Sequence, residues 1–193
     1  MDSWYNSAMN KSAVILRTDQ QTRARFTTAE FLRMGETGAF DDIKVELVDG
    51  ELERMNPPLT AHAARQMQIG IRLSRLLPEA RIMGEIGVDL GNDTVLGCDV
   101  AVLREPAEGN RLLAADAFLL VIEVAETSVA RDTTMKRFAY ARGGIPHYWV
   151  VDGNRSVVHV YTNPLEGDYT RFHSVGFGEM LDVPGTDGTI TID

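Results

Sequence analysis

The chain has 193 residues, 44% of them hydrophobic, and a formal net charge of −9 at pH 7. This length and composition suit one globular domain with a full core, while the negative charge argues against a protein that binds nucleic acid over its whole surface. No apolar run approaches the roughly 20 residues that span a bilayer, and Cys98 is the lone cysteine, so we expect no membrane segment, no internal disulfide and a cytoplasmic location.

The N-terminal quarter of the sequence predicts an arm, a short helix and a hairpin. Residues 1–25 show no sustained hydrophobic periodicity, so we predict a loosely ordered arm, followed by a single domain over residues 26–193. Residues 27–30 read Thr-Thr-Ala-Glu, which is a capping box and predicts a helix start. Two strand-like runs then meet at Asp49-Gly50, the strongest two-residue hairpin signal in the chain.

Residues 60–77 form the longest predicted helix. Its expected apolar stripe comprises Ala64, Met67, Ile71 and Ser74. The opposite stripe comprises Arg65, Gln68, Arg72 and Arg75. The arginines of this stripe form either a solvated helix face or part of a track that faces phosphate groups.

The second half of the chain predicts a sheet with one further helix. Strand-like runs cover residues 82–90, 98–103, 118–124, 169–175 and 188–192. A helix over residues 131–142 ends at Gly143-Gly144, and a hairpin crosses Gly153-Asn154. This order of elements predicts an α/β, or α+β, domain with a mixed sheet.

Two acidic residues interrupt strands that should be buried. Glu123 lies within the apolar run of residues 119–124, and Asp99 lies within the strand-like run Cys98–Leu103. A carboxylate inside the core is costly to desolvate and needs a cation or strong hydrogen bonds. If the two strands pair, the carboxylates face each other with Cβ atoms about 5 Å apart and can share Mg²⁺ or Mn²⁺. The alternative is that each acid ends a strand and faces water.

A lysine and a third acid extend this pattern. Asp132, Lys136 and Tyr140 repeat every four residues and predict one polar ridge on the second helix. Lys136 either reaches over the strand end to a scissile phosphate or attacking water, or forms an ordinary surface pair with Asp132. Glu46, in the first hairpin, either completes the metal site or faces solvent. Weaker candidates of the same kind are Glu85 and Glu126.

Residues 123–152 carry a longer pattern, in which E-V-A-E-T-S is followed by D-T-T-M-K-R-F-A-Y-A and then by G-I-P-H-Y-W-V-V-D. This string resembles the signature of the Uma-type family of restriction endonucleases. Upstream pieces agree with the same family: the segments FTTAEFLRM and VELVDGELERMNPP, the helix that contains His62, and CDVAVL. The resemblance covers about residues 26–162.

The resemblance implies the PD-(D/E)XK nuclease superfamily, with a restriction endonuclease-like αβββαβ core, a mixed sheet and, in this chain, additional β-hairpins. It implies that Asp99 and Glu123 bind the metal ion and that Glu46 is the upstream acid of the same site. Lys136 is then the motif lysine, moved from the strand onto the following helix. The positions that support this lysine are matched by Asp132 and Tyr140.

Two positions depart from the family pattern, because Cys98 replaces a proline and Glu85 stands where a glutamine is expected. Neither departure removes a catalytic group. We therefore expect a Mg²⁺- or Mn²⁺-dependent endonuclease that hydrolyses phosphodiester bonds in DNA. The alternatives are a non-catalytic binding or regulatory module that keeps the fold and metal site, and a phosphodiesterase that acts on RNA or a small nucleotide.

Assembly is predicted from the reaction. Cutting both strands of a duplex usually takes two active sites, so we expect a homodimer. The expected interface is exposed apolar surface on the C-terminal strands, formed by Val157, Val158, Val160 and Tyr161.

Overall fold

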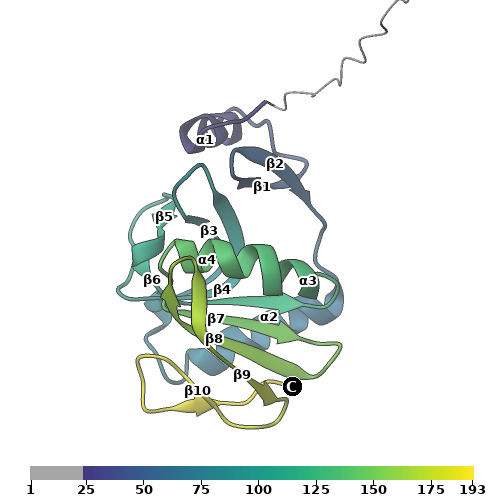
Figure 1. The fold of residues 1–193 in the computed structure, drawn as a ribbon, viewed down its shortest axis with the longest axis vertical. Coiled ribbons are helices and arrows are strands. Elements are labelled where there is room, and N and C mark those ends of the chain that lie inside the picture. Colours follow the sequence, from purple (N-terminus) through teal and green to yellow (C-terminus); the bar gives the residue numbers. More distant parts are fainter. Residues whose placement is uncertain (1–23) are drawn as a thin grey trace, which may run out of the picture.

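The computed structural model describes residues 24–193, so the arm predicted for residues 1–25 lies almost entirely outside the described part of the chain. A central sheet carries helices on both of its faces (Figure 1). Among these residues, no helix combines the length and the apolar character needed to cross a membrane.

The strands of the central sheet are β1 Lys44–Val48, β2 Glu51–Met55, β3 Ile82–Asp89, β4 Val95–Leu103, β5 Leu113–Ala114, β6 Phe118–Ala125, β7 His147–Asp152, β8 Val157–Leu165 and β9 Asp168–Gly176. A separate two-stranded sheet contains β10 Leu181–Asp182 and β11 Thr189–Ile190. The α-helices are α1 Thr28–Glu36, α2 Thr60–Leu73, α3 Val129–Arg131 and α4 Arg137–Arg142. Shorter helical segments are the 3₁₀ helices Glu79–Arg81 and Ala115–Ala117 and the π-helical turn Asp132–Lys136.

The sheet order brings distant parts of the sequence side by side. Its strands follow the order β2-β1-β4-β6-β7-β8-β9, and β3 pairs with β4 and β5. The sheet is mixed, as predicted, because β6 and β7 run parallel while β4–β6 and β7–β8 are antiparallel. The crossover from β6 to β7 runs through α3 and α4, which completes the predicted αβββαβ order of α2, β3, β4, β6, α4 and β7.

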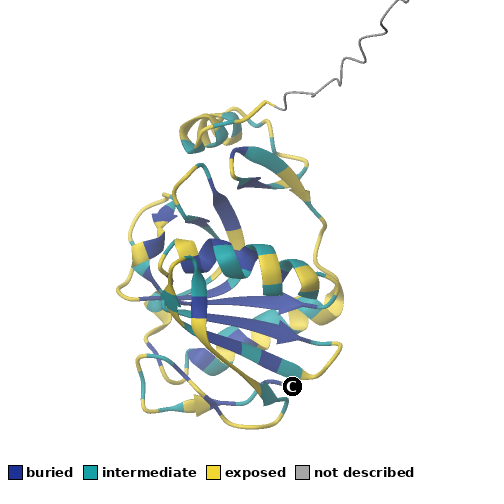
Figure 2. Ribbon diagram, in the orientation of Figure 1, coloured by how far each residue is buried: buried dark blue, intermediate teal, exposed yellow. Residues whose placement is uncertain are grey.

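Both faces of the central strands are covered, which explains their nearly continuous apolar sequences. On one face, α4 contributes Ala139 and Tyr140 to the core, and on the other face α2 contributes Ile69 and Leu73. Figure 2 shows the resulting burial along β6 and β7. An acidic side chain on one of these strands therefore has little water around it and needs partners within the protein.

The predicted apolar stripe of the long helix is wrong. The helix ends at Leu73, and its buried residues are Ile69 and Leu73, whereas Met67 and Ile71 are 65% and 48% exposed. Ala64 and Ser74 offer too little apolar area to decide which way the helix turns. Two branched side chains four residues apart bury more area, so Ile69 and Leu73 face the sheet.

Two arginines of the predicted stripe are held in ion pairs. The Arg65 guanidinium contacts the Glu126 carboxylate, and Arg65 Nε donates to the Asp193 carbonyl at 3.1 Å. Arg72 pairs with the Asp193 carboxylate and donates to the Thr191 carbonyl. These arginines therefore fasten α2 to the C-terminal segment rather than standing free in solvent.

The predicted hairpins are confirmed. Asp49 and Gly50 have φ angles of 47° and 81°, and both positive values are what a type I′ turn requires. The second hairpin joins β7 to β8 with Asp152 opposite Val157. Of the two weak C-terminal strands, the first extends to all of β9, while the second is reduced to β11.

The interface predicted on β8 is wrong. Val158, Val160 and Tyr161 are 1%, 5% and 6% exposed within the single chain. β9 pairs along the edge of β8, and the two core clusters cover its faces. Three of the four residues predicted for the interface are therefore already buried by the chain itself, and Val157 is half-buried.

Candidate active site

The candidate site lies where β1, β4 and β6 are neighbours in the sheet. These strands carry Glu46, Asp99 and Glu123 respectively. The β4–β6 ladder ends where Val100 lies opposite Ile122, and Asp99 and Glu123 each lie one residue beyond this last pair. The three acids named from the sequence thus come together although they are far apart in the chain.

Regular strand pairing breaks down around Asp99. The β3–β4 ladder skips the pair of Glu85 and Asp99, and Glu85 has a φ of 48°, an uncommon backbone conformation for a residue other than glycine. On the other side of β4, the Asp99 carboxylate replaces a backbone acceptor, because Oδ2 accepts a hydrogen bond from the Val124 amide at 2.6 Å. The side chain of Asp99 is therefore built into the sheet itself.

The lysine predicted for the site is buried beside Glu123. Lys136 Nζ lies 2.9 Å from Glu123 Oε1 and donates to the Gly97 carbonyl at 2.9 Å. Tyr140 donates its hydroxyl to the same Glu123 oxygen at 2.7 Å. Lys136 and Glu123 are each 3% exposed. The surface-pair alternative for Lys136 is excluded by this burial.

Glu46 is the second carboxylate in contact with Lys136. Its Oε1 lies 3.3 Å from Lys136 Nζ and accepts from the Gly97 amide at 2.8 Å. Its Oε2 accepts from Arg131 Nη2 at 2.7 Å, and the same nitrogen lies 2.7 Å from Glu53 Oε2 on β2. Glu46 is 4% exposed, so the alternative in which it faces solvent is wrong.

The pKa values of Lys136 and Glu123 are set by burial and by the charges around them. Burial acts to lower the pKa of Lys136, but the carboxylates of Glu123, Glu46 and Asp132 outweigh it, so the pKa is raised and the amine stays protonated. Burial raises the pKa of Glu123, and Lys136 opposes that rise. Each group thus depends on the other for its charge.

The predicted ridge of Asp132, Lys136 and Tyr140 exists, but it faces the core. The exposed fractions of these side chains are 2%, 3% and 0%. The π-helical turn over residues 132–136 lies between α3 and α4, a feature often found at functional sites. Burial raises the pKa of Asp132, whose Oδ2 accepts from the Ser128 hydroxyl at 2.5 Å.

A second group of contacts reaches Asp99 from α2. His62 Nε2 lies 3.1 Å from Asp99 Oδ1, and Gln66 Nε2 donates to the Asp99 carbonyl at 2.8 Å. The hydrogen bond to Asp99 raises the pKa of His62, against the opposing effect of burial. Asp99 and His62 side chains are 20% and 18% exposed, so this part of the site is open to solvent.

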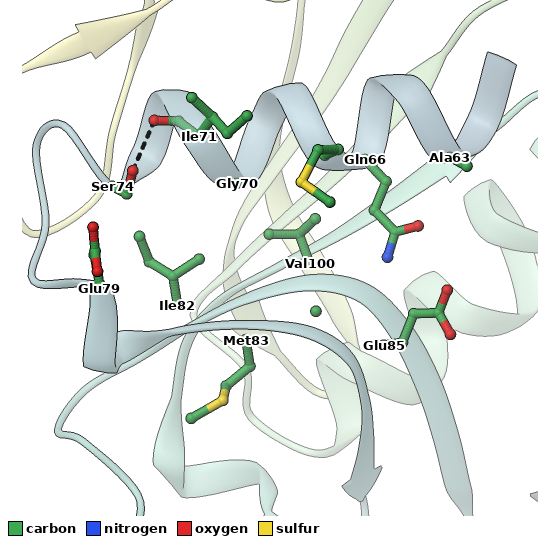
Figure 3. A pocket seen from close by; sticks show the side chains of 12 residues that line it. Ala63, Gln66, Gly70, Ile71, Ser74, Glu79, Ile82, Met83, Glu85 and Val100 are labelled. Atoms are coloured by element: carbon green, nitrogen blue, oxygen red, sulfur yellow. Dashed lines mark hydrogen bonds between the residues drawn. The ribbon is translucent and has the colours of Figure 1, made fainter. Parts of the chain in front are cut away.

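A groove of about 520 Å³ between α2 and β3 adjoins this open side. Figure 3 shows Gln66 and Glu85 at one end of the groove and Ser74 and Glu79 at the other. The exposed side chain of Met67 also lines the groove. Because Gln66 contacts both the groove and Asp99, the groove leads to the candidate site.

The two weaker candidates from the sequence, Glu85 and Glu126, form ion pairs outside the site. Glu85 Oε2 lies 2.5 Å from Lys44 Nζ, and Glu126 pairs with Arg65. Sequence reasoning missed Arg131 and Gln66 as members of the site. Arg131 directly precedes the ridge, and Gln66 follows His62 by one helical turn, so both spacings were available as signals.

Two of the carboxylates in the site retain acceptor positions that a divalent cation could use. In the described part of the chain, no three His, Cys, Asp or Glu side chains form a ready-made metal site. Glu123 Oε1 receives two hydrogen bonds, but Oε2 receives none from the described residues, and each Asp99 oxygen receives one. Each carboxylate oxygen has two lone pairs, so Asp99 and Glu123 keep acceptor capacity. Mg²⁺ is bound by one or two carboxylates together with water and phosphate oxygens, so the chemical type of these two ligands suits it.

The fold is restriction endonuclease-like, and the structural comparison agrees. The chain is similar to a crystal structure from Anabaena variabilis ATCC 29413, described as a "putative nuclease belonging to DUF820". The TM-score is 0.66 at 21% identity, over 86% of this chain and 94% of that one. No curated protein matches the sequence.

Residues 28–192 match the model of the Uma2 family, described as "Putative restriction endonuclease". The chain therefore belongs to the Uma2 family. The match includes every residue assigned to the candidate site, and it confirms the resemblance drawn from residues 26–162.

Proposed function

We propose that the protein is a metal-dependent endonuclease that hydrolyses phosphodiester bonds in DNA. The observation that carries the proposal is Lys136, a cation 3% exposed that is held by Glu123 and Glu46 beside Asp99. An ammonium group fixed next to cation-binding carboxylates suits the stabilisation of charge on a phosphate. Membership of the Uma2 family supports the nuclease class.

The four residues predicted from the sequence take distinct roles in this proposal. Asp99 and Glu123 hold Mg²⁺ or Mn²⁺ through their remaining lone pairs. The bound cation would polarise the phosphate and lower the pKa of a water molecule. Glu46 assists at the metal site by fixing Lys136 and Arg131, and direct ligation by Glu46 would require Arg131 to move away.

Lys136 acts as a fixed positive charge in this scheme. Its raised pKa keeps the amine protonated, so it serves as a hydrogen-bond donor and not as a proton acceptor. It offsets negative charge that develops on the scissile phosphate or orients the attacking water. Tyr140 donates a hydrogen bond to Glu123 and so keeps its carboxylate in place beside the lysine.

A non-catalytic binding module is the second candidate, and one observation favours it. Several cations around the site are already paired with acids of the same chain: Arg131 with Glu46 and Glu53, Arg65 with Glu126, and Lys44 with Glu85. These pairs leave fewer free cations for a DNA backbone. RNA and small nucleotides are alternative substrates, and the cleavage experiment below includes them.

The proposal is tested by combining thermal stability with cleavage. We expect Mg²⁺ or Mn²⁺ to raise the melting temperature and to support nicking of supercoiled plasmid DNA, with EDTA abolishing both effects. Asp187→Asn, which removes one exposed acid, is the matched control for variants of the site. Stabilisation by the cation without cleavage of DNA, RNA or a small nucleotide would favour the binding module.

We further propose that residues 26–193 act as one cytoplasmic domain and that two copies assemble for double-strand cleavage. The dimer must use a surface other than the buried face of β8. Light scattering with and without DNA measures the assembly, and a monomer at all accessible concentrations would contradict it.

A further inference from the structure

Asp99 receives three hydrogen bonds, one from β6 and two from α2. The Val124 amide on β6 donates to Oδ2 at 2.6 Å. His62 Nε2 lies 3.1 Å from Oδ1, and Gln66 Nε2 donates to the main-chain carbonyl at 2.8 Å. Both oxygens of the side chain and the backbone oxygen are therefore fixed, at the point where β3 and β4 lose regular pairing.

His62 and Gln66 are placed together by the helix. They are four residues apart and so lie on the same face of α2. Further along the helix, Ile69 and Leu73 are buried, and Arg72 pairs with Asp193. The two donors thus project from an element that the core and the C-terminal segment hold in place.

The hydrogen bonds to Asp99 leave some lone-pair positions of its carboxylate unoccupied. A carboxylate has about four lone-pair positions, and His62 and Val124 occupy one on each oxygen of Asp99. One position on each oxygen remains for a cation. Glu46 differs, because its Oε1 accepts from the Gly97 amide and lies 3.3 Å from Lys136 Nζ, while its Oε2 accepts from Arg131.

We propose that His62 and Gln66 are positioning residues for Asp99: they fix its carboxylate and backbone so that the free lone pairs point toward the bound cation. This inference rests on the proposed function for the identity of the ligand, but the contact itself exists without metal. Partners of this kind that orient a metal ligand are worth about 10- to 100-fold in metal affinity.

The first experiment measures Mn²⁺ affinity by calorimetry on the full chain. His62→Ala should weaken Mn²⁺ binding by about 10-fold or more. His62→Gln keeps an N–H donor at similar reach and should restore affinity to within about threefold of the wild type. His173→Ala, on exposed β9, and Gln68→Ala, on the exposed face of α2, are the matched controls for His62→Ala and Gln66→Ala.

The second experiment is a double-mutant cycle between His62→Ala and Asp99→Asn in metal-free protein. A direct contact predicts that the unfolding constants of the single and double variants deviate from additivity by about threefold or more. This cycle needs neither metal nor substrate, so it remains informative if a variant loses activity.

The outcomes separate this inference from the proposed function. Additive variants in the cycle, or His62→Ala protein that binds Mn²⁺ as tightly as the wild type, would overturn the positioning role. Wild-type protein that binds no Mn²⁺ would instead overturn the proposed function. Weakened Mn²⁺ binding that His62→Gln restores, with unchanged stability in the controls, supports the inference.

Discussion

The two sides of the candidate site are built differently. On the α4 side, Glu123 and Lys136 are each 3% exposed and depend on each other for their charge. On the α2 side, Asp99 and His62 are 20% and 18% exposed, and a histidine and a backbone amide hold the carboxylate. We therefore expect a change on the α4 side to lower stability as well as the proposed activity, and a change on the α2 side to affect ligand binding at little cost to the fold.

The largest expected effect is on the α4 side, in Lys136→Met. Removing one partner of a buried ion pair leaves uncompensated charge, so we expect a loss of about 3–5 kcal/mol in the free energy of unfolding at neutral pH. Urea denaturation of the metal-free protein measures the loss. A change of a few tenths of a kcal/mol would show that the lysine is not the partner of Glu123.

The pH dependence of the stability of Lys136→Met shows whether the charge on Glu123 causes the loss. Without Lys136, burial raises the pKa of Glu123 unopposed by the amine, so the folded chain binds more protons than the unfolded chain. Its stability relative to the wild type should therefore fall as the pH rises above the unfolded value of about 4.3. A variant equally destabilised at pH 5 and pH 7.5 would contradict a charge on Glu123 as the cause.

A smaller effect on the same side is expected in Tyr140→Phe. The hydroxyl donates to Glu123 Oε1 at 2.7 Å, and a hydrogen bond to a charged group contributes about 1.5–3 kcal/mol. Tyr169→Phe is the matched control, because its hydroxyl donates to the neutral Ile145 carbonyl in the same core. We expect the control to lose about 1 kcal/mol and to leave Mn²⁺ affinity unchanged. Equal Mn²⁺ affinities in the wild type, Tyr140→Phe and Tyr169→Phe would show that Tyr140 does not contribute to the metal site.

The smallest effect on stability is expected on the α2 side, in Asp99→Asn. The free energy of unfolding of the metal-free protein should change by less than about 1 kcal/mol, and it can rise, because one of several clustered acids is removed. Most of the thermal stabilisation by Mg²⁺ should disappear at the same time. Calorimetry that finds an unchanged response to Mg²⁺ would exclude Asp99 as a ligand.

The strands and the hairpin turns were predicted from the sequence, and so was a partner for the buried Glu123, which is Lys136. These predictions succeeded because continuous apolar runs and turn residues are local signals, and because a charge inside a buried strand requires a partner. The orientation of α2 was not predictable in this way. Met67 and Ile71 have the right spacing for a core face, and only the competition with Ile69 and Leu73 for the sheet decides against them.

The partners of the site also depended on tertiary structure. A four-residue repeat shows that Asp132, Lys136 and Tyr140 share a helix face, but it does not show whether that face meets water or the sheet. The contact of Gln66 with the Asp99 carbonyl forms where β4 departs from regular pairing. A break of this kind has no local sequence signal, because it arises from the register of two strands.

The central claim is that Lys136 assists phosphodiester cleavage beside Asp99 and Glu123. Its most direct test is the rate of plasmid nicking by Lys136→Ala in Mg²⁺ or Mn²⁺, at a temperature where circular dichroism shows the variant to be folded. We expect a loss of about 10²- to 10³-fold relative to the wild type, with cation binding intact or tighter, and incomplete rescue by Lys136→Arg. Nicking by Lys136→Ala at the wild-type rate, under conditions where the wild type requires the metal ion, would contradict the mechanism.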